Sequence, residues 1–201
     1  MIRVLVADDQ ALIRGAFATL VNLEPDMTVV AQVGTGDDVL PAAVRERPDV
    51  ALLDVQMPGM DGLAAAAVLA GRLPSCRVII LTTFGRPGYL RRAMEARAAG
   101  FMVKDAPPET LIDAIRRVHS GLRVVDPDLA AESLALGESP LTGRERDVLL
   151  ASADGGTIGQ IAKRVFLSEG TVRNHLSSVI GKTAAATRAD ALRIATERGW
   201  I

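Results

Sequence analysis

The chain has 201 residues and a formal net charge of −1, which allows one large domain or two small ones and excludes no partner by itself. Hydrophobic residues make up 49% of it, which excludes a disordered chain, and aromatic residues only 3%, so aliphatic side chains must form the cores. With Cys76 as the only cysteine and no apolar run near the roughly 20 residues of a membrane helix, we expect no disulfide, no membrane partner and a cytoplasmic location.

The front of the chain alternates short apolar runs with longer helix-like stretches. The runs predict five strands, at residues 2–7, 28–33, 50–53, 78–81 and 101–103. The stretches predict five helices, near residues 11–22, 36–46, 61–71, 87–97 and 107–119. Strands and helices in alternation indicate a five-stranded, parallel, doubly wound α/β domain whose sheet is covered on both faces.

Residues 120–139 interrupt this alternation. Gly and Pro residues punctuate them, and their one periodic piece, residues 129–136, is a short helix at most. We therefore predict a linker over 120–139, which separates a first domain of residues 1–119 from a second domain of residues 140–201.

The second domain has a purely helical pattern. Thr142 followed by Glu145 is a capping-box pattern that begins one helix, and the Gly-Gly pair at 155–156 is expected to end it. Thr157 and Ser168 are suited to cap two further helices. A helix, a short turn and a capped helix in this order indicate a helix-turn-helix in a small all-α domain.

Acidic, hydroxyl and amino side chains follow the predicted strands at their carboxyl ends. Asp8 and Asp9 end the first strand, Asp54 the third, Thr82 the fourth and Lys104 the fifth. These ends share one edge of a doubly wound sheet, so we expect the five side chains to lie together. Three carboxylates in one place repel each other and need a cation, and oxygen ligands suit Mg²⁺.

This set of residues suits phosphoryl chemistry. A carboxylate such as Asp54 can attack phosphorus and form an acyl phosphate. Lys104 could neutralise phosphoryl oxygens, and the hydroxyl of Thr82 could bond to one of them. Each residue also has a structural alternative: a helix cap for the Asp pair, turn chemistry for Asp54, and a solvated loop for Lys104.

The first 120 residues resemble the receiver domains of two-component response regulators. The resemblance rests on the runs ending in Asp8-Asp9, Leu-Leu-Asp54-Val-Gln-Met-Pro-Gly-Met-Asp-Gly62, Leu-Thr82-Thr and Gly-Phe-Met-Val-Lys104-Asp. It implies a flavodoxin-like fold, a sensor histidine kinase as phosphodonor and Mg²⁺ as cofactor, with no activity beyond the receiver's own phosphorylation and dephosphorylation. The implied roles are phosphoacceptor for Asp54, metal ligands for Asp9, Asp54 and the backbone carbonyl of Gln56, water-mediated metal contact for Asp8, and a switch pair of Thr82 and Phe101.

The second domain carries a positive charge that suits DNA. Residues 140–201 hold nine basic and six acidic side chains, which leaves fourteen basic and eighteen acidic ones for the rest of the chain, although so small a difference can also arise by chance. Arg and Asn on the third helix can read base edges, and basic residues further on can contact the backbone; an ordinary polar surface helix is the alternative. The predicted DNA contacts are Thr171, Arg173, Asn174, Ser177, Lys182 and Arg188.

Residues 140–200 resemble the four-helix DNA-binding domains of the NarL/FixJ/LuxR family. Leu-Thr-Gly-Arg-Glu-Arg and Leu-Ser-Glu-Gly-Thr-Val-Arg-Asn-His carry the resemblance. It implies a scaffold helix first, a positioning helix at 157–165, a recognition helix at 168–182 and a dimerising helix at 188–198. The chain departs from the family at Thr183 and the alanines after it, where relatives have a Leu and a turn glycine, and this departure could loosen the last helix.

Together these resemblances predict a transcriptional regulator whose phosphorylation at Asp54 promotes dimerisation and binding to double-stranded promoter DNA. A regulator with a vestigial receiver that binds DNA without phosphorylation is the alternative. An aspartate-dependent phosphohydrolase is disfavoured, because such enzymes usually carry a second Asp where this chain has Gln56. Residues 81–90 and the terminal Arg-Gly-Trp also resemble regulators of lipid desaturation. The family implies a receiver homodimer, with Ala11, Leu12, Ile115 and Val118 as candidate contacts, although all four could instead be core residues.

Overall fold

The computed structural model describes residues 1–83, 87–135 and 139–201, and their side chains except at 87, 88 and 132–135. The chain divides into two compact units near residue 131. None of the helices in the described residues has the length and apolar character needed to cross a bilayer.

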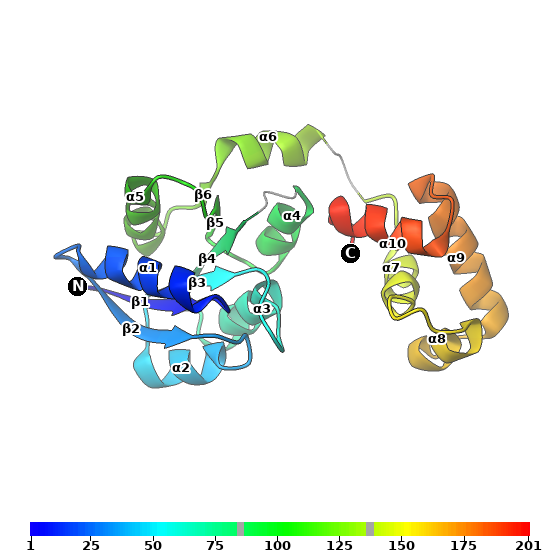
Figure 1. The fold of residues 1–201 in the computed structure, drawn as a ribbon, viewed down its shortest axis with the longest axis horizontal. Helices are drawn as coiled ribbons and strands as arrows, with labels where there is room; N and C mark the ends of the chain where they lie inside the picture. The colour runs from blue at the N-terminus through cyan, green and yellow to red at the C-terminus, as the bar shows by residue number, and fades with distance from the viewer. Residues whose placement is uncertain (84–86, 136–138) are drawn as a thin grey trace. The chain divides into compact units, whose positions relative to one another are not determined.

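A parallel sheet forms the centre of the first unit. Among the described residues it has six strands in the order β2-β1-β3-β4-β5-β6 (Figure 1). The strands are β1 (Ile2–Ala7), β2 (Met27–Val33), β3 (Val50–Asp54), β4 (Arg77–Thr82), β5 (Gly100–Val103) and β6 (Val124–Val125). The five predicted strands and the doubly wound architecture are confirmed. The prediction missed β6, because two residues are too few to show an alternating pattern.

Helices cover both faces of this sheet. They are α1 (Ala11–Asn22), α2 (Val39–Glu46), α3 (Gly62–Arg72), α4 (Pro87–Glu95) and α5 (Pro108–His119). Apolar residues of α1 and α5 pack against one face, and those of α2, α3 and α4 pack against the other (Figure 1). Because side chains alternate along a strand, neighbours in β3 contribute to opposite cores: Leu52 packs with α5 and Leu53 with α3.

Burial corrects two of the predicted dimer contacts. The side chains of Ile115 and Val118 are 0% exposed, because the apolar stripe of α5 faces the sheet. They cannot contact a second chain in this structure, so these two predictions are wrong. Ala11 and Leu12 lie on the surface of α1, and Leu12 is 86% exposed.

The predicted linker contains a strand and a helix. After β6 comes α6 (Pro127–Ala135), which includes most of the periodic piece at 129–136. β6 pairs in parallel with β5, and Leu129 is buried in the core that also holds Phe101. Residues 136–138 of the predicted linker lie outside the described residues, and the predicted domain boundaries stay predictions.

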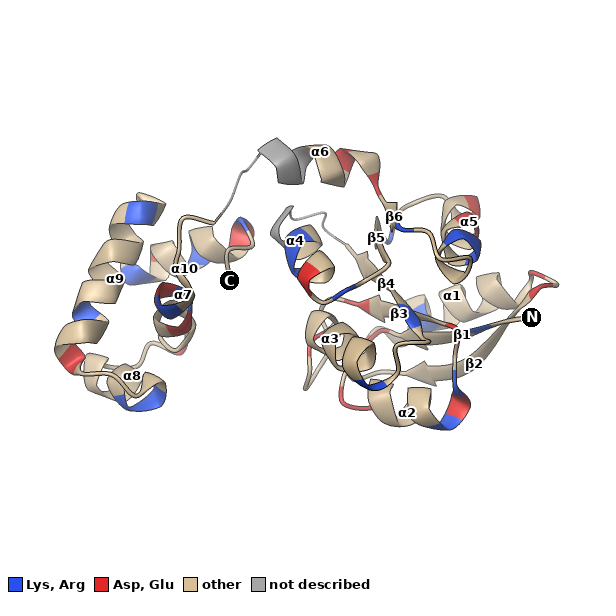
Figure 2. Cartoon of the chain, turned by 180° about the vertical axis from the view of Figure 1, so that it is seen from behind, with Lys and Arg blue, Asp and Glu red and all other residues tan. Residues whose placement is uncertain are grey.

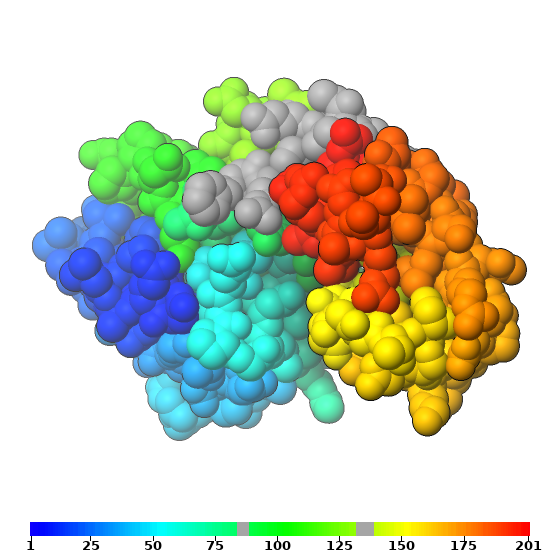
Figure 3. Space-filling view, turned by 45° about the vertical axis from the view of Figure 1, so that its right-hand side comes forward, coloured from blue at the N-terminus to red at the C-terminus, as the bar shows by residue number. Residues whose placement is uncertain are grey.

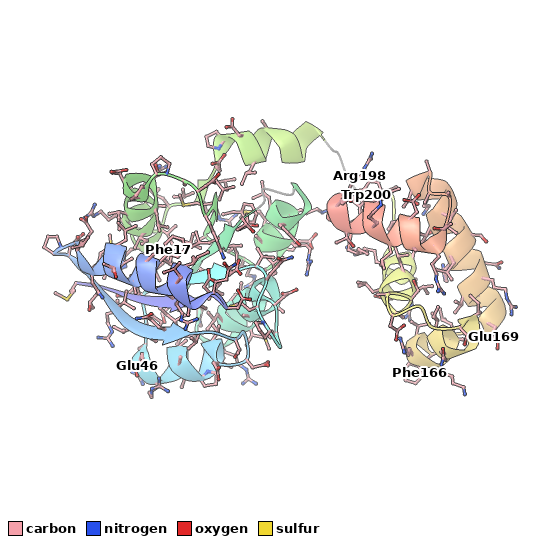
Figure 4. All side chains as sticks on the ribbon, viewed as in Figure 1. Phe17, Glu46, Phe166, Glu169, Arg198 and Trp200 are labelled. Carbon is pink, nitrogen blue, oxygen red and sulfur yellow. The ribbon has the colours of Figure 1, made fainter. Side chains whose placement is uncertain are left out.

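The second unit is all-α, as predicted. Within residues 139–201, all described, its four helices are α7 (Gly143–Leu150), α8 (Ile158–Val165), α9 (Glu169–Thr183) and α10 (Arg188–Glu197). They pack together as one body (yellow to red in Figure 3). Trp200 closes one end of the core, and the guanidinium carbon of Arg198 lies 5.2 Å from its ring centroid (Figure 4).

The predicted caps of this unit are formed. Thr142 and Glu145 make a capping box on α7, and the Ser168 side chain accepts from the Thr171 N–H on α9. Thr157 makes a second capping box with Gln160 on α8. The Gly-Gly pair at 155–156 does not end α7, because α7 stops at Leu150 and turns lead on to the glycines.

The departure after α9 is accommodated at a backbone cost. Thr183 is buried, and its Oγ1 donates to the Val179 carbonyl at 2.8 Å, so its hydroxyl has a partner. Ala184 adopts the left-handed conformation at φ 52° and ψ 32°, which in L-residues other than Gly is unfavourable. The missing turn glycine therefore leaves strain in the backbone without breaking the fold.

We expect Ala184→Gly to stabilise the second unit by about 0.5–1 kcal/mol, because Gly adopts the left-handed conformation without strain. The greater conformational freedom of Gly in the unfolded chain offsets part of this stabilisation. Urea unfolding followed by the fluorescence of Trp200, the only tryptophan, measures the change. Ala186→Gly is the matched control, because Ala186 is exposed and has no positive φ. A midpoint for Ala184→Gly at or below that of the control would contradict the expectation.

Candidate phosphoacceptor and DNA-binding sites

The sheet brings the predicted acidic residues together. Asp8 and Asp9 follow β1, and Asp54 is the last residue of β3, which pairs with β1. Carboxylate oxygens of all three lie within 4.8 Å of one another. Thr82 ends β4, the next strand along, and is buried. The predicted convergence at the carboxyl edge of the sheet is observed.

Lys104 binds two of the three carboxylates. Its Nζ lies 2.6 Å from Asp8 Oδ2 and 3.0 Å from Asp54 Oδ1, and each of the three side chains is at most 6% exposed. Burial of two carboxylates beside one ammonium leaves excess negative charge that water cannot screen well. A cation of higher charge would relieve it.

The two aspartates after β1 differ in their surroundings. Asp8 Oδ1 accepts from the Gln10 N–H at 2.9 Å, so both of its oxygens have protein partners. Arg14 Nη1 donates to the Asp8 carbonyl at 2.6 Å and holds this loop in place. Asp9 is exposed. The geometry thus makes Asp9 the more available metal ligand.

The surroundings of Asp54 shift the pKa of its carboxyl. Burial raises the pKa of its carboxyl above the usual value, while the hydrogen bond and charge of Lys104 act in the opposite direction. The backbone of Gln56 also acts to lower this pKa. Asp54 therefore sits in a site that favours a partner able to spread its negative charge.

The predicted switch residues lie on neighbouring strands. Phe101 of β5 pairs with Ile80 of β4 and is fully buried in the core formed with α2, α3 and α4. Thr82 is two residues further along β4 and 3% exposed. The core role of Phe101 is thus observed, and its role in switching stays a prediction.

The donor set fits a magnesium ion. Three carboxylates with oxygens in close reach are hard ligands, and neither Cys nor His is among them. Gln56 lines the same cavity as Asp9, which places its backbone near the predicted metal position.

The predicted recognition helix exposes a polar face. Arg173, Asn174 and Ser177 of α9 are exposed, and Thr171 is half-buried with its hydroxyl 2.8 Å from Ser168 Oγ. Lys and Arg residues lie on α8 and α9 (Figure 2). The Arg173 guanidinium rests on Glu169 at 2.8 Å, a half-exposed pair that DNA could replace at little cost.

Two of the predicted DNA contacts have partners inside the protein. Lys182 Nζ lies 2.7 Å from Glu145 Oε2 on α7, and Arg188 Nη1 donates to the Gly156 carbonyl at 2.9 Å. Lys182 thus joins α9 to α7, and Arg188 joins α10 to the loop before α8. Their contact with DNA stays a prediction.

Comparison with known families identifies the chain. Response regulator receiver domains match residues 4–116, and the bacterial regulatory proteins of the luxR family match residues 139–195. The chain belongs to the two-component response regulators with a LuxR-type DNA-binding domain. It is a DNA-binding transcriptional regulator, and not an enzyme beyond receiver self-phosphorylation.

Relatives of this response regulator match over its whole length. The transcriptional regulatory proteins YvfU and DesR of Bacillus subtilis are 43% and 42% identical to it over 201 residues, with all of each chain covered. The crystal structure of the response regulator ChrA of a heme-sensing two-component system has a TM-score of 0.60 at 31% identity, with 100% of this chain and 98% of that chain covered. An RcsB–DNA complex, at 21% identity and a TM-score of 0.68 over 98% of both chains, shares the fold.

The likeness to DesR confirms the resemblance predicted from residues 81–90 and the terminal Arg-Gly-Trp. YvfU is as similar to the chain as DesR is. Residues 84–86 of the motif that suggested it lie outside the described residues.

Sequence reasoning missed two charged residues of the receiver site. Arg92 of α4 lies 3.1 Å from Asp61, the cap residue of α3, and both line a cavity with Asp9. Arg14 holds the carbonyl of Asp8. Neither residue belongs to the strand-end motifs, and Arg92 is 31 residues from its partner, so no local pattern indicates either contact.

Proposed function

We propose that the receiver accepts a phosphoryl group on Asp54 from a sensor histidine kinase and that this modification promotes dimerisation and binding to promoter DNA. The observation that carries the proposal is the buried Asp8–Lys104–Asp54 cluster, with Asp9 at its open side. A regulator that binds promoter DNA acts in the cytoplasm, and we place this one there.

Each residue of the site has a part in the transfer. A carboxylate oxygen of Asp54 attacks phosphorus, and the bond between phosphorus and the kinase's histidine nitrogen breaks. Lys104 holds Asp54 in place and neutralises the transferred group. Asp9, Asp54 and the Gln56 carbonyl would hold Mg²⁺ directly and Asp8 through water; when bound, the ion supplies positive charge at the phosphoryl oxygens.

Phosphorylation would then act through neighbouring strands. The Thr82 hydroxyl moves toward the phosphoryl group, and Phe101 packs behind it, which favours a dimer-competent receiver. Ala11 and Leu12 on α1 are the remaining candidate dimer contacts. Two linked recognition helices would read half-sites about one DNA turn apart or a multiple of it.

Intact mass and oligomeric state test the proposal. Wild type, Asp54→Ala and the control Asp113→Ala, whose side chain is exposed on α5, are incubated with Mg²⁺ and phosphoramidate. We expect wild type and control to gain the mass of one phosphoryl group and to dimerise, and Asp54→Ala to do neither. If wild type gains no mass but binds a duplex that it selects from a random DNA pool, the receiver is vestigial and the proposal is wrong.

A further inference from the structure

The last strand of the receiver sheet belongs to the segment that leads to the DNA-binding unit. β6 pairs in parallel with β5, and Val125 of β6 lies opposite Phe101, the predicted switch residue. The Val124 N–H donates to the Ala99 carbonyl at 2.9 Å, and the Asp126 N–H donates to the Phe101 carbonyl at 3.2 Å. Helix α6 follows directly and crosses the division between the two units near residue 131 (Figure 1). The backbone of this segment is therefore bonded to the switch residue itself.

Asp126 joins the strand of the switch residue to the first turn of α6. Its Oδ1 accepts from the Asp128 N–H at 2.9 Å and from the Leu129 N–H at 3.3 Å, and so caps the helix. Its carbonyl accepts from the Ala130 N–H at 3.0 Å. Because its own N–H is bonded to the Phe101 carbonyl, a displacement of Phe101 reaches the start of α6 through this single residue.

One apolar side chain fastens α6 to the receiver core. Among the described side chains of α6, Leu129 is the one that is buried, at 6% exposed, and it packs in the core that holds Phe101. Val125 packs against the same core, and its side chain lies on the same face of the sheet as Phe101, because paired residues of parallel strands point to one side. The start of α6 is thus held by Val125, Asp126 and Leu129, which we call the α6 anchor.

We propose that the α6 anchor makes the linker helix respond to the phosphorylation of Asp54. The inference rests on the proposed phosphorylation and on the proposed packing of Phe101 behind Thr82. In a close-packed core, the movement of a large ring removes contacts from its neighbours, so the packing of Val125 and Leu129 weakens. The first turn of α6 then opens, and the longer free linker lets two DNA-binding units reach paired half-sites.

Hydrogen exchange followed by mass spectrometry tests this response in the full chain. The protein is compared with and without Mg²⁺ and phosphoramidate, and intact mass reports the phosphorylation. We expect the amides of residues 126–131 to exchange at least about fivefold faster in the phosphorylated protein, because opening of the first turn breaks their hydrogen bonds. The amides of α7 in the other unit are the reference and should keep their rate. Unchanged or slower exchange at residues 126–131 would overturn the inference.

Two substitutions should release α6 without phosphorylation. Leu129→Ala removes the buried side chain, and Asp126→Ala removes the cap but keeps the backbone bond to Phe101. We expect each unphosphorylated variant to bind a duplex selected from a random DNA pool at least about fivefold more tightly than unphosphorylated wild type does, and phosphorylation to add correspondingly less. Both variants should gain the phosphoryl mass at the wild-type rate, because neither residue belongs to the acidic site.

Matched controls separate the anchor from the composition of the segment. Leu122→Ala removes a leucine that is 53% exposed shortly before β6, and Asp126→Asn keeps an acceptor that can cap α6. Both should bind DNA as wild type does. If Leu129→Ala fails to fold, Asp126→Ala decides, since the Asp126 side chain is only half-buried.

The outcomes distinguish this inference from the proposed function. Wild-type DNA affinity in unphosphorylated Asp126→Ala would overturn the inference, and so would equal tightening in Leu122→Ala. If wild type gains no phosphoryl mass, the proposed function fails and the inference falls with it. If wild type is phosphorylated and dimerises while the exchange of α6 stays the same, the inference alone is wrong.

Discussion

Glu145→Ala is expected to destabilise the DNA-binding domain by about 2–3 kcal/mol. Glu145 of α7 is 4% exposed, and it accepts three hydrogen bonds at 2.7 Å each, from the Thr142 N–H, Ser178 Oγ and Lys182 Nζ. Removal of the carboxylate leaves these donors without their acceptor and breaks the two bonds that join α9 to α7. This expected loss of stability is smaller than the loss on breaking a fully buried ion pair, because the Lys182 side chain is 34% exposed.

Urea unfolding followed by Trp200 fluorescence reports on this domain, since Trp200 packs in its core. Glu169→Ala is the control, because Glu169 is an exposed acidic residue of the same domain that pairs only with exposed Arg173 among the described residues; we expect a change below about 0.5 kcal/mol. A midpoint for Glu145→Ala within error of the control would show that the three bonds contribute nothing net.

The pH dependence of stability gives a second check on Glu145. Burial alone would raise the pKa of its carboxyl, but the bonds from Lys182, Thr142 and Ser178 lower it to about 2, from 4.5. A depressed pKa means that the stabilisation is complete above pH 4.5 and is lost as the pH falls toward 2. Glu145→Gln has no carboxyl here, so the difference between wild type and this variant should shrink over that interval.

The acidic site was predictable because the topology of the sheet determines which strand ends lie together. In a parallel doubly wound sheet, the carboxyl ends of neighbouring strands must meet, so residues as distant as Asp8, Asp54 and Lys104 were placed together from strand positions alone. The same holds for the caps Thr142 and Ser168, which act on backbone within three residues. Local or topological constraints of this kind are readable in one sequence.

Contacts between elements were not predictable in this way. The pattern of α5 shows that Ile115 and Val118 share an apolar stripe, but not whether the sheet or a second chain covers it. Likewise, Lys182 looks free for DNA in the sequence, whereas the packing of α7 against α9 puts Glu145 beside it, 37 residues away. A helical pattern fixes which face a side chain lies on, and only the tertiary fold decides what that face meets.

The glycine after Asp61 makes a contact of this tertiary kind that no other residue can make. A Cβ at Gly62 would lie 1.8 Å from the carbonyl oxygen of Asp54 and 2.8 Å from its carbonyl carbon. Both are backbone atoms of the phosphoacceptor strand, so no side-chain rotation can relieve the overlap. The Gly62 N–H also donates to the Val55 carbonyl at 3.0 Å and ties the start of α3 to this strand.

Gly62→Ala must therefore move Asp54 or the start of α3. We expect the receiver to lose at least about 3 kcal/mol of stability and phosphorylation of Asp54 to slow by about 100-fold or more, because the carboxylate leaves the reach of Lys104. Far-UV circular dichroism in urea and intact mass with phosphoramidate measure the two effects. Gly71→Ala on the same helix is the matched control: no described atom lies within 4 Å of a Cβ built there, so alanine should stabilise α3 by up to about 1 kcal/mol. Near-normal phosphorylation in Gly62→Ala would mean that the loop after Asp54 can shift without moving its carboxylate, and the tight approach of α3 would then have no part in placing the phosphoacceptor.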